Sequence, residues 1–324
     1  ESVKITVVAG GVGGSRFLLG LRSAYPDADI TAIVNVGDDM WHVGVRIAPD
    51  LDTIMYTLAG QNDTVRGWGR VGESERVAGE LRAYNVGWPW FTLGDLDLGT
   101  HLARTHYLRS GLPLSEVVPL LTSRWDIGVT LLPSTDSEVE THVRVAPSAD
   151  APTGTLHFQE WWTRHRAALP ALAFDFVGVS SAVPAPGVVA ALAEADVVLL
   201  APSNPVVSIG AILAIPSLAD AVRATSAPVV GVSPIISGAV VRGMADACLT
   251  AIGVSTSADA VALHYGARSA GGVLDGWLVD TADDAAVAAV ASAGITARAV
   301  PLWLSDDATR AQVARDAVEL ALSL

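Results

Sequence analysis

Residues 3–39 alternate an apolar run, a glycine cluster, a helical run and a second apolar run, and this order limits the fold more than any other feature of the chain. Residues 3–9 and 30–36 are rich in β-branched side chains, and four glycines in five residues follow the first run. Strands that are buried on both faces have continuous apolar sequences. A strand, a helix and a second strand in this order form one βαβ unit. The opening therefore predicts an α/β protein with a parallel sheet.

Apolar runs at residues 196–201, 227–232, 276–279 and 296–304 continue the same pattern and are separated by alanine-rich helical sequence. Between them, residues 74–84, 100–110 and 114–121 have helical spacing and are interrupted by loops rich in glycine and tryptophan. We expect a single α/β domain over residues 1–324. Its core is a Rossmann-like, mostly parallel sheet with helices on both faces, and residues 51–166 form a mostly helical insertion.

Composition narrows the class of protein further. Twenty basic and thirty-four acidic residues give a net charge of −14, which disfavours nucleic acid as a partner. The single cysteine, Cys248, allows no intramolecular disulfide and fits a reducing compartment. There is no signal-peptide pattern and no clean apolar stretch of about 20 residues. We expect a soluble, cytoplasmic protein that does not enter a membrane.

The glycine cluster is the clearest candidate ligand site. Gly10, Gly11, Gly13 and Gly14 lie between the first strand and the first helix, where backbone amides at the positive end of the helix dipole can hold a phosphate. We expect Arg16 on the first turn of this helix, where it can supply a fixed positive charge. The third glycine of the dinucleotide fingerprint is replaced, and a Walker A lysine is missing. A tight turn that needs glycine only for its geometry is the alternative interpretation.

Three pairs of aspartates follow predicted strands or begin predicted helices. Around one anion site they would repel the ligand unless a cation lay among them, and Mg²⁺ prefers carboxylates together with phosphate oxygens. Asp50 and Asp52 are the predicted metal ligands. Asp52 at a helix start is also a candidate N-cap, so capping remains an alternative. The three pairs are Asp38 with Asp39, Asp50 with Asp52, and Asp95 with Asp97.

Two later strands are followed by polar turns that contain Ser203, Asn204 and Ser233. Such side chains can contact a nucleobase edge or a phosphate, and ordinary capped βα turns are the alternative. The seven histidines show no metal-binding spacing, and His101 and His106 would not share a helical face. The sequence also lacks a G-x-S-x-G nucleophile motif. Hydrolase chemistry is therefore disfavoured.

Taken in order, these motifs resemble the 2-phospho-L-lactate transferase family over nearly the whole chain. After the middle strand the family pattern Pro-Met-Ser-Asp is replaced by Pro133-Ser134-Thr135-Asp136, so only Asp136 carries over there. The motifs that carry the resemblance are Gly10 to Gly14, Asn35-Val36-Gly37-Asp38-Asp39, Pro49-Asp50-Leu51-Asp52-Thr53, Gly94-Asp95-Leu96-Asp97, Phe158-Gln159-Glu160-Trp161-Trp162, Pro202-Ser203-Asn204-Pro205 and Ser233-Pro234-Ile235-Ile236.

The resemblance implies a Mg²⁺-dependent transferase of coenzyme factor 420 biosynthesis that works as a homodimer. The donor is a guanylyl diphosphate ester of a three-carbon acid, the acceptor is the ribitol hydroxyl of the deazaflavin Fo, and GMP leaves. The high alanine and valine content and the use of arginine over lysine are typical of actinobacterial proteins. The actinobacterial version of the family resembles a phosphoenolpyruvate transferase that yields the dehydro form of the coenzyme, but the sequence leaves enolpyruvyl and lactyl donors open. Asp52 and Asp38 are the candidate bases. Substrate contacts are expected from Gly10, Gly11, Gly13, Gly14, Arg16, Asp52, Thr92, Asp136, Ser203, Asn204 and Ser233.

Two other functions fit the same fold. An NAD(P)-dependent oxidoreductase would use the glycine loop for a dinucleotide, which the incomplete fingerprint disfavours. A non-catalytic nucleotide sensor would bind the nucleotide without turnover. A turnover assay separates the sensor from the transferase.

Overall fold

The computed structural model describes residues 1–324, and its centre is a seven-stranded parallel sheet in the order β14-β13-β10-β9-β1-β2-β5. The predicted α/β fold with a parallel sheet is confirmed. The strands are β1 (Lys4–Ala9), β2 (Asp29–Val34), β5 (Thr130–Pro133), β9 (Val197–Leu200), β10 (Val229–Val232), β13 (Gly276–Val279) and β14 (Thr296–Ala299).

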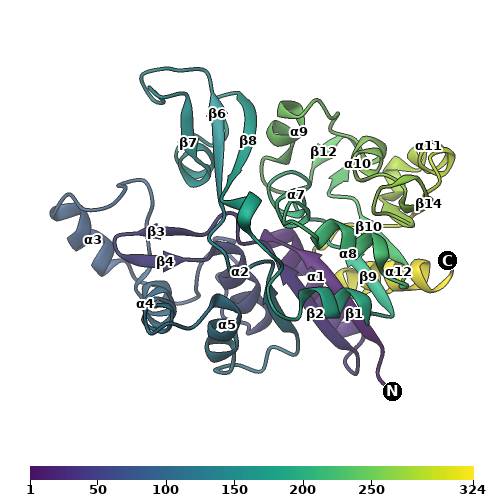
Figure 1. Cartoon of the computed structure of the whole chain (residues 1–324), viewed down its shortest axis with the longest axis horizontal. Helices are drawn as coiled ribbons and strands as arrows, with labels where there is room; N and C mark the ends of the chain where they lie inside the picture. The colour runs from purple at the N-terminus through teal and green to yellow at the C-terminus, as the bar shows by residue number, and fades with distance from the viewer.

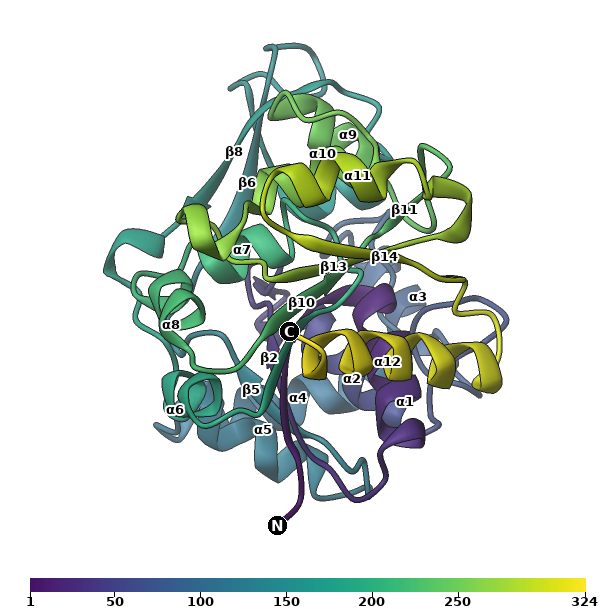
Figure 2. The ribbon, with the colours of Figure 1, turned by 90° about the vertical axis from the view of Figure 1, so that its right-hand side faces the viewer.

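Helices cover both faces of this sheet, as Figure 2 shows. Ile5, Val7 and Ala9 of β1 join a buried core on one face, whereas Val8 joins a second core on the opposite face. The first core includes residues of α1 (Gly11–Ala24), α2 (Pro49–Leu58), α5 (Leu114–Thr122) and α12 (Asp307–Leu322). The second includes residues of α6 (Val188–Ala193), α7 (Ile209–Leu213), α8 (Leu218–Ala224), α9 (Ala245–Ala251), α10 (Ala258–Tyr265) and α11 (Ala286–Ser292).

The region between residues 51 and 166 is only partly helical. It contains α3 (Arg76–Ala83), α4 (Asp95–Arg109) and α5, and then β5 returns to the edge of the central sheet. Beyond β5, three antiparallel strands form a separate sheet that projects from the body of the molecule (Figure 1). These strands are β6 (Glu140–Val145), β7 (Thr155–His157) and β8 (Ala171–Val177). The α-helical part thus ends before residue 130, and apart from a five-residue π-helix at Glu160–Arg164 the rest of the region consists of strands and loops.

Two small hairpins complete the structure. The hairpin of β3 (Met40–His42) and β4 (Val45–Ile47) connects the loop after β2 to α2, and β11 (Ile235–Ile236) pairs with β12 (Ala239–Val240) after β10. The Thr141 amide of β6 donates to the Gly37 carbonyl at 2.8 Å, which ties the projecting sheet to the loop after β2. No helix has the length and apolar character needed to cross a membrane.

Candidate active site

The glycine loop begins α1 at the carboxyl end of β1. Gly10 is the N-cap in extended conformation and Gly11 has a φ of +64°, which favours glycine. A Cβ on Gly13 would lie 2.6 Å from the Pro202 carbonyl oxygen, so the helix approaches the loop after β9 too closely for any side chain there. The N–H groups of Val12 and Gly13 have no hydrogen-bond partner. Two free amides therefore remain at the N-terminus of a 14-residue helix.

The serine and asparagine side chains of the later turns hold backbone rather than projecting freely. The Ser203 hydroxyl accepts from the Gly10 amide at 3.0 Å and donates to the Gly10 carbonyl at 2.7 Å. Asn204 Oδ1 accepts from the amides of the second and third residues after it, and the Ser233 hydroxyl bonds to Ile235. These contacts match the ordinary turn interpretation, and Ser203 additionally fixes the glycine loop in place.

Asp50 faces the glycine loop from the first turn of α2. Its Oδ2 accepts from Asn35 Nδ2 at 3.0 Å, and Asn35 Oδ1 accepts from the Gly37 amide at 2.8 Å. A Cβ on Gly10 would lie 2.8 Å from Asp50 Oδ2, so this glycine gives the carboxylate its room. Burial raises the pKa of Asp50 to about 6, although hydrogen bonds from Asn35 and the Gly11 amide lower it.

Asp38 and Asp39 lie beside Asp50 in the loop after β2, and all three side chains are buried. Asp38 Oδ1 and both carboxylate oxygens of Asp39 have no hydrogen-bond partner. Burial, followed by repulsion from Asp50, raises the pKa of Asp38. Burial also raises the pKa of Asp39, against the opposing charges of Arg46 and Arg104. Buried carboxylates without partners are costly unless a cation neutralises them. We call residues 10–14, 35–39 and Asp50 the glycine-loop region.

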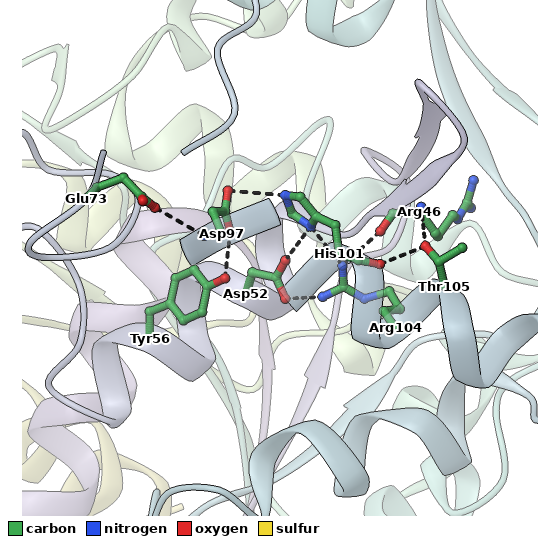
Figure 3. Close-up of polar contacts among 8 residues, drawn as sticks. All are labelled: Arg46, Asp52, Tyr56, Glu73, Asp97, His101, Arg104 and Thr105. Atoms are coloured by element: carbon green, nitrogen blue, oxygen red, sulfur yellow. Dashed lines mark hydrogen bonds and ion pairs between the residues drawn. The ribbon is translucent and has the colours of Figure 1, made fainter. Parts of the chain in front are cut away.

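The side chain of Asp52 contacts a different set of residues from that of Asp50, as Figure 3 shows. Its Oδ1 accepts from Arg104 Nη2, and its Oδ2 lies 3.5 Å from His101 Nδ1. His101 Nε2 lies 3.2 Å from Asp97 Oδ2, and the Tyr56 hydroxyl donates to Asp97 Oδ1 at 2.6 Å. We call Asp52, Tyr56, Asp97, His101 and Arg104 the Asp52 network.

Hydrogen bonding sets the tautomer of His101. Arg104 Nη1 lies 3.2 Å from His101 Nδ1, and because arginine can only donate, Nδ1 accepts and Nε2 carries the proton toward Asp97. Oxygen and nitrogen atoms of Asp52, Asp97 and His101 lie within 4.8 Å of one another, a spacing compatible with a metal. In this arrangement neither ring nitrogen of His101 offers a free lone pair, and Arg104 already supplies a positive charge to Asp52. Asp52 Oδ2 and His101 Nε2 have no hydrogen-bond partner. The Asp52 network is thus a buried ion pair, and the metal role of Asp52 remains a prediction.

The pKa values of the two carboxylates of the network are shifted in opposite directions. Burial raises the pKa of Asp52 against the opposing effects of Arg104 and His101. Burial alone would also raise the pKa of Asp97, but hydrogen bonds from His101 and Tyr56 outweigh it and lower that pKa. Glu73 accepts from the Leu96 and Asp97 amides at 2.8 and 3.1 Å, which fixes the first turn of α4. A Cβ on Gly94 would overlap the Glu73 side chain in this position, so a larger residue there would displace Glu73.

The structure thus places the two predicted metal ligands in different surroundings. Asp50 and Asp52 are two residues apart on a helix, about 200° around its axis, so their carboxylates reach different surroundings. The N-cap of α2 is Ala48, so Asp52 is not the cap. Arg16 is half-buried and makes no ion pair, and Thr92 is also half-buried. Asp136 accepts from the amide and hydroxyl of Ser115 at the start of α5.

Sequence reasoning missed His101, Arg104 and Tyr56. Asp97 and His101 are spaced i, i+4 on α4, which is the one local signal that they can interact. Nothing in the sequence indicated that this helix lies beside α2, since Arg104 and Asp52 are 52 residues apart.

Comparison with known proteins gives consistent results. The family described as 2-phospho-L-lactate transferase CofD matches residues 5–313 of the chain. A phosphoenolpyruvate transferase of Nocardia farcinica is 54% identical, with 98% of this chain and 95% of that protein covered. One of Streptomyces coelicolor is 53% identical, with 98% of each covered. A solved structure of a UPF0052 family protein from Bacillus halodurans is 16% identical with a TM-score of 0.64, covers 98% of this chain and 99% of that one, and bears on the fold alone.

Proposed function

This chain belongs to the 2-phospho-L-lactate transferase family, and from that we propose that it transfers a phosphoenolpyruvyl or 2-phospholactyl group from a guanylyl diphosphate donor to the ribitol hydroxyl of the deazaflavin Fo. The products are GMP and the (dehydro) form of coenzyme factor 420-0. The names of the actinobacterial relatives support the enolpyruvyl donor. The observation that carries the proposal is a set of buried carboxylates without partners beside free amides of a glycine loop.

The glycine loop supports binding of the donor diphosphate. The free amides of Val12 and Gly13 point from the N-terminus of α1, where the helix dipole favours an anion. Arg16, on the next turn and without an acidic partner, adds a full positive charge. In a chain of net charge −14 these are local attractions against an unfavourable background, so we expect a cation to be needed as well.

The glycine-loop region fits Mg²⁺. Asp39 and Asp50 offer carboxylate oxygens, the hard ligands that this ion prefers, and both Asp39 oxygens have no other partner. We propose that these two residues hold it, with Asp50 as the one predicted ligand that keeps its role. When bound, Mg²⁺ would neutralise diphosphate charge and polarise the phosphorus that is attacked.

Asp38 is the proposed base. Its Oδ1 is enclosed without a partner, while its Oδ2 makes no hydrogen bond and is not enclosed. A carboxylate with one reachable oxygen and a raised pKa can accept the proton of an alcohol held within hydrogen-bond distance. The chain contributes mainly by positioning, because transfer of this kind leaves little covalent chemistry to the protein. Asp52 would then act by holding α4 against α2.

The test is release of GMP in the presence of Mg²⁺, the enolpyruvyl guanylyl diphosphate and the deazaflavin riboside. We expect GMP only when all three are present and loss of release with EDTA. Equal release without the deazaflavin would identify a hydrolase. No release under any condition, with GDP still bound, would support the sensor, and enhanced NADH fluorescence on titration would support the oxidoreductase.

A further inference from the structure

The segment between α2 and α3 contains a compact loop over residues 61–71, which we call the 61–71 loop. The Val71 amide donates to the Gln61 carbonyl at 2.9 Å and closes the base of the loop. Arg70 is buried beside this base, and its guanidinium lies over the Tyr56 ring of α2, 5.4 Å from the ring centroid. The base of the loop is therefore anchored on α2.

The far end of the 61–71 loop contacts a segment from the C-terminal half of the chain. Arg242 Nη2 donates to the Gly67 carbonyl at 3.1 Å, although the two residues are 175 positions apart. Arg242 belongs to the segment after β10, and β10 ends at the same edge of the parallel sheet as β1, where the glycine loop begins. Gly67 has a φ of +81°, and a Cβ there would overlap the Arg242 guanidinium. A side chain at position 67 would therefore displace Arg242.

The Arg242 guanidinium lies near a second cation, Arg16 of α1. Burial, followed by the like charges of Arg242 and Arg310, lowers the pKa of Arg16. Neither Arg16 nor Arg242 forms an ion pair, and the Gly67 carbonyl is the one hydrogen-bond partner of the Arg242 side chain. Arg16 lies on the turn of α1 that follows the free amides of the glycine loop. Two cations in this arrangement repel each other until an anion neutralises one of them.

We propose that Arg242 is a positioning residue that holds the 61–71 loop against the segment after β10 while a phosphate group is bound at the N-terminus of α1. We call its contact with Gly67 the latch. A bound phosphate neutralises Arg16, which removes the repulsion of Arg242 and strengthens the latch. Because this coupling is reciprocal, the closed latch in turn tightens phosphate binding. The inference rests on the proposed function only for the anion site at the glycine loop.

The test measures the association and dissociation rates of ribose-labelled GDP with Mg²⁺ by stopped-flow fluorescence. Arg242→Ala breaks the latch from one side, and its control is Arg109→Ala, because Arg109 also donates to a glycine carbonyl, that of Gly44, at 3.1 Å. Gly67→Ala breaks the latch from the other side and keeps every charge. Its control is Gly72→Ala, which has a φ of +68° and no atom within 4 Å of the added Cβ.

The latch closes after the phosphate has bound, so its loss should change dissociation rather than association. We expect Arg242→Ala and Gly67→Ala each to speed GDP dissociation by about five- to tenfold, with association within about twofold of wild type. Both controls should match wild type. Arg242→Lys should recover most of the slow dissociation, because lysine can still donate to the carbonyl. The double variant Arg242→Ala/Gly67→Ala should release GDP no faster than either single variant.

Three results would overturn the latch. Fast dissociation from Arg242→Ala with wild-type dissociation from Gly67→Ala would show that Arg242 contacts the phosphate itself. Wild-type dissociation from both folded variants would show that the contact does not affect the ligand. A wild-type chain that binds no GDP would refute the anion site and the latch together. Failure of the proposed function is recognised separately, since a chain that binds GDP and transfers nothing to the deazaflavin would lose the transferase and keep the latch.

Discussion

Two neighbouring regions of the molecule bury carboxylates in opposite ways. In the glycine-loop region Asp38 and Asp39 have oxygens without partners, and all three carboxylates there have raised pKa values. In the Asp52 network, two residues further along α2, Arg104 neutralises Asp52, and His101 and Tyr56 satisfy Asp97. Asp52 Oδ2 and His101 Nε2 also lack a hydrogen-bond partner, so the two regions differ in charge rather than in hydrogen bonding. The Asp52 network contains its own cation in Arg104, whereas Asp38, Asp39 and Asp50 form no ion pair. The difference indicates that the glycine-loop region is the one that needs a cation from a ligand.

The largest expected effect is a loss of stability when the ion pair of the Asp52 network is broken. Arg104→Met should lower the free energy of unfolding by about 3–5 kcal/mol, because it leaves the Asp52 charge buried without a partner. Urea denaturation at pH 7 measures this loss. The double variant Asp52→Asn/Arg104→Met removes both charges and should recover a large part of it. Equal stability of the single and double variants would show that the ion pair is not what holds α4 to α2.

Gly13→Val tests the glycine-loop region. The added side chain meets the Pro202 carbonyl and covers the free amides, so GDP affinity should fall by more than about 100-fold and stability by about 1–3 kcal/mol. The close approach of the loop after β9 is the cause of the stability cost. Calorimetric titration with GDP is the measurement. Wild-type affinity in the folded variant would contradict the phosphate-binding role of the loop.

Asp50→Asn tests the glycine-loop region through the pH dependence of stability. We expect the Asp50 carboxylate to bind Mg²⁺ rather than to stabilise the fold. A carboxyl whose pKa is raised on folding stabilises the protein least when it is ionised, so wild-type stability in EDTA should fall as pH rises from about 4 to 6, on the order of 2 kcal/mol from this group. Asp50→Asn should lose that part of the pH dependence. Urea midpoints at pH 4.5 and 7 for both proteins provide the check, and identical slopes would contradict the assignment.

The smallest effect is a control on α4. A Cβ on Gly99 would meet no atom within 4 Å, and the residue lies inside the helix. Gly99→Ala should therefore raise the free energy of unfolding by roughly 0.5–1 kcal/mol and leave GDP affinity unchanged. Thermal unfolding and the same titration measure both quantities. A loss of affinity would mean that α4 affects the glycine-loop region more directly than its contacts indicate.

The two regions also differ in how far the sequence could predict them. The glycine loop, the aspartates after β2 and the apolar strands are local patterns, so the parallel sheet and the position of the candidate anion site could be predicted from them. The division of Asp50 from Asp52 depends on helix rotation and on what lies opposite each side chain, and Arg104 approaches only because α4 lies beside α2. Ser203 and Asn204 gave a correct turn pattern, but their bonds to Gly10 and to the following amides appear only in three dimensions. The homodimer remains a prediction.

We propose that Mg²⁺ and the donor bind at Asp50, while Asp52 holds α4 against α2. The most direct test is the Kd for GDP with and without Mg²⁺ in Asp50→Asn and in Asp52→Asn/Arg104→Met. We predict that Asp50→Asn loses the Mg²⁺ dependence while its fold is kept, and that the double variant keeps the dependence with a Kd within about threefold of wild type, because its uncharged pair leaves Asp50 and the glycine loop in place. The reverse result, with Mg²⁺ dependence lost in the folded double variant and kept in Asp50→Asn, would contradict the account.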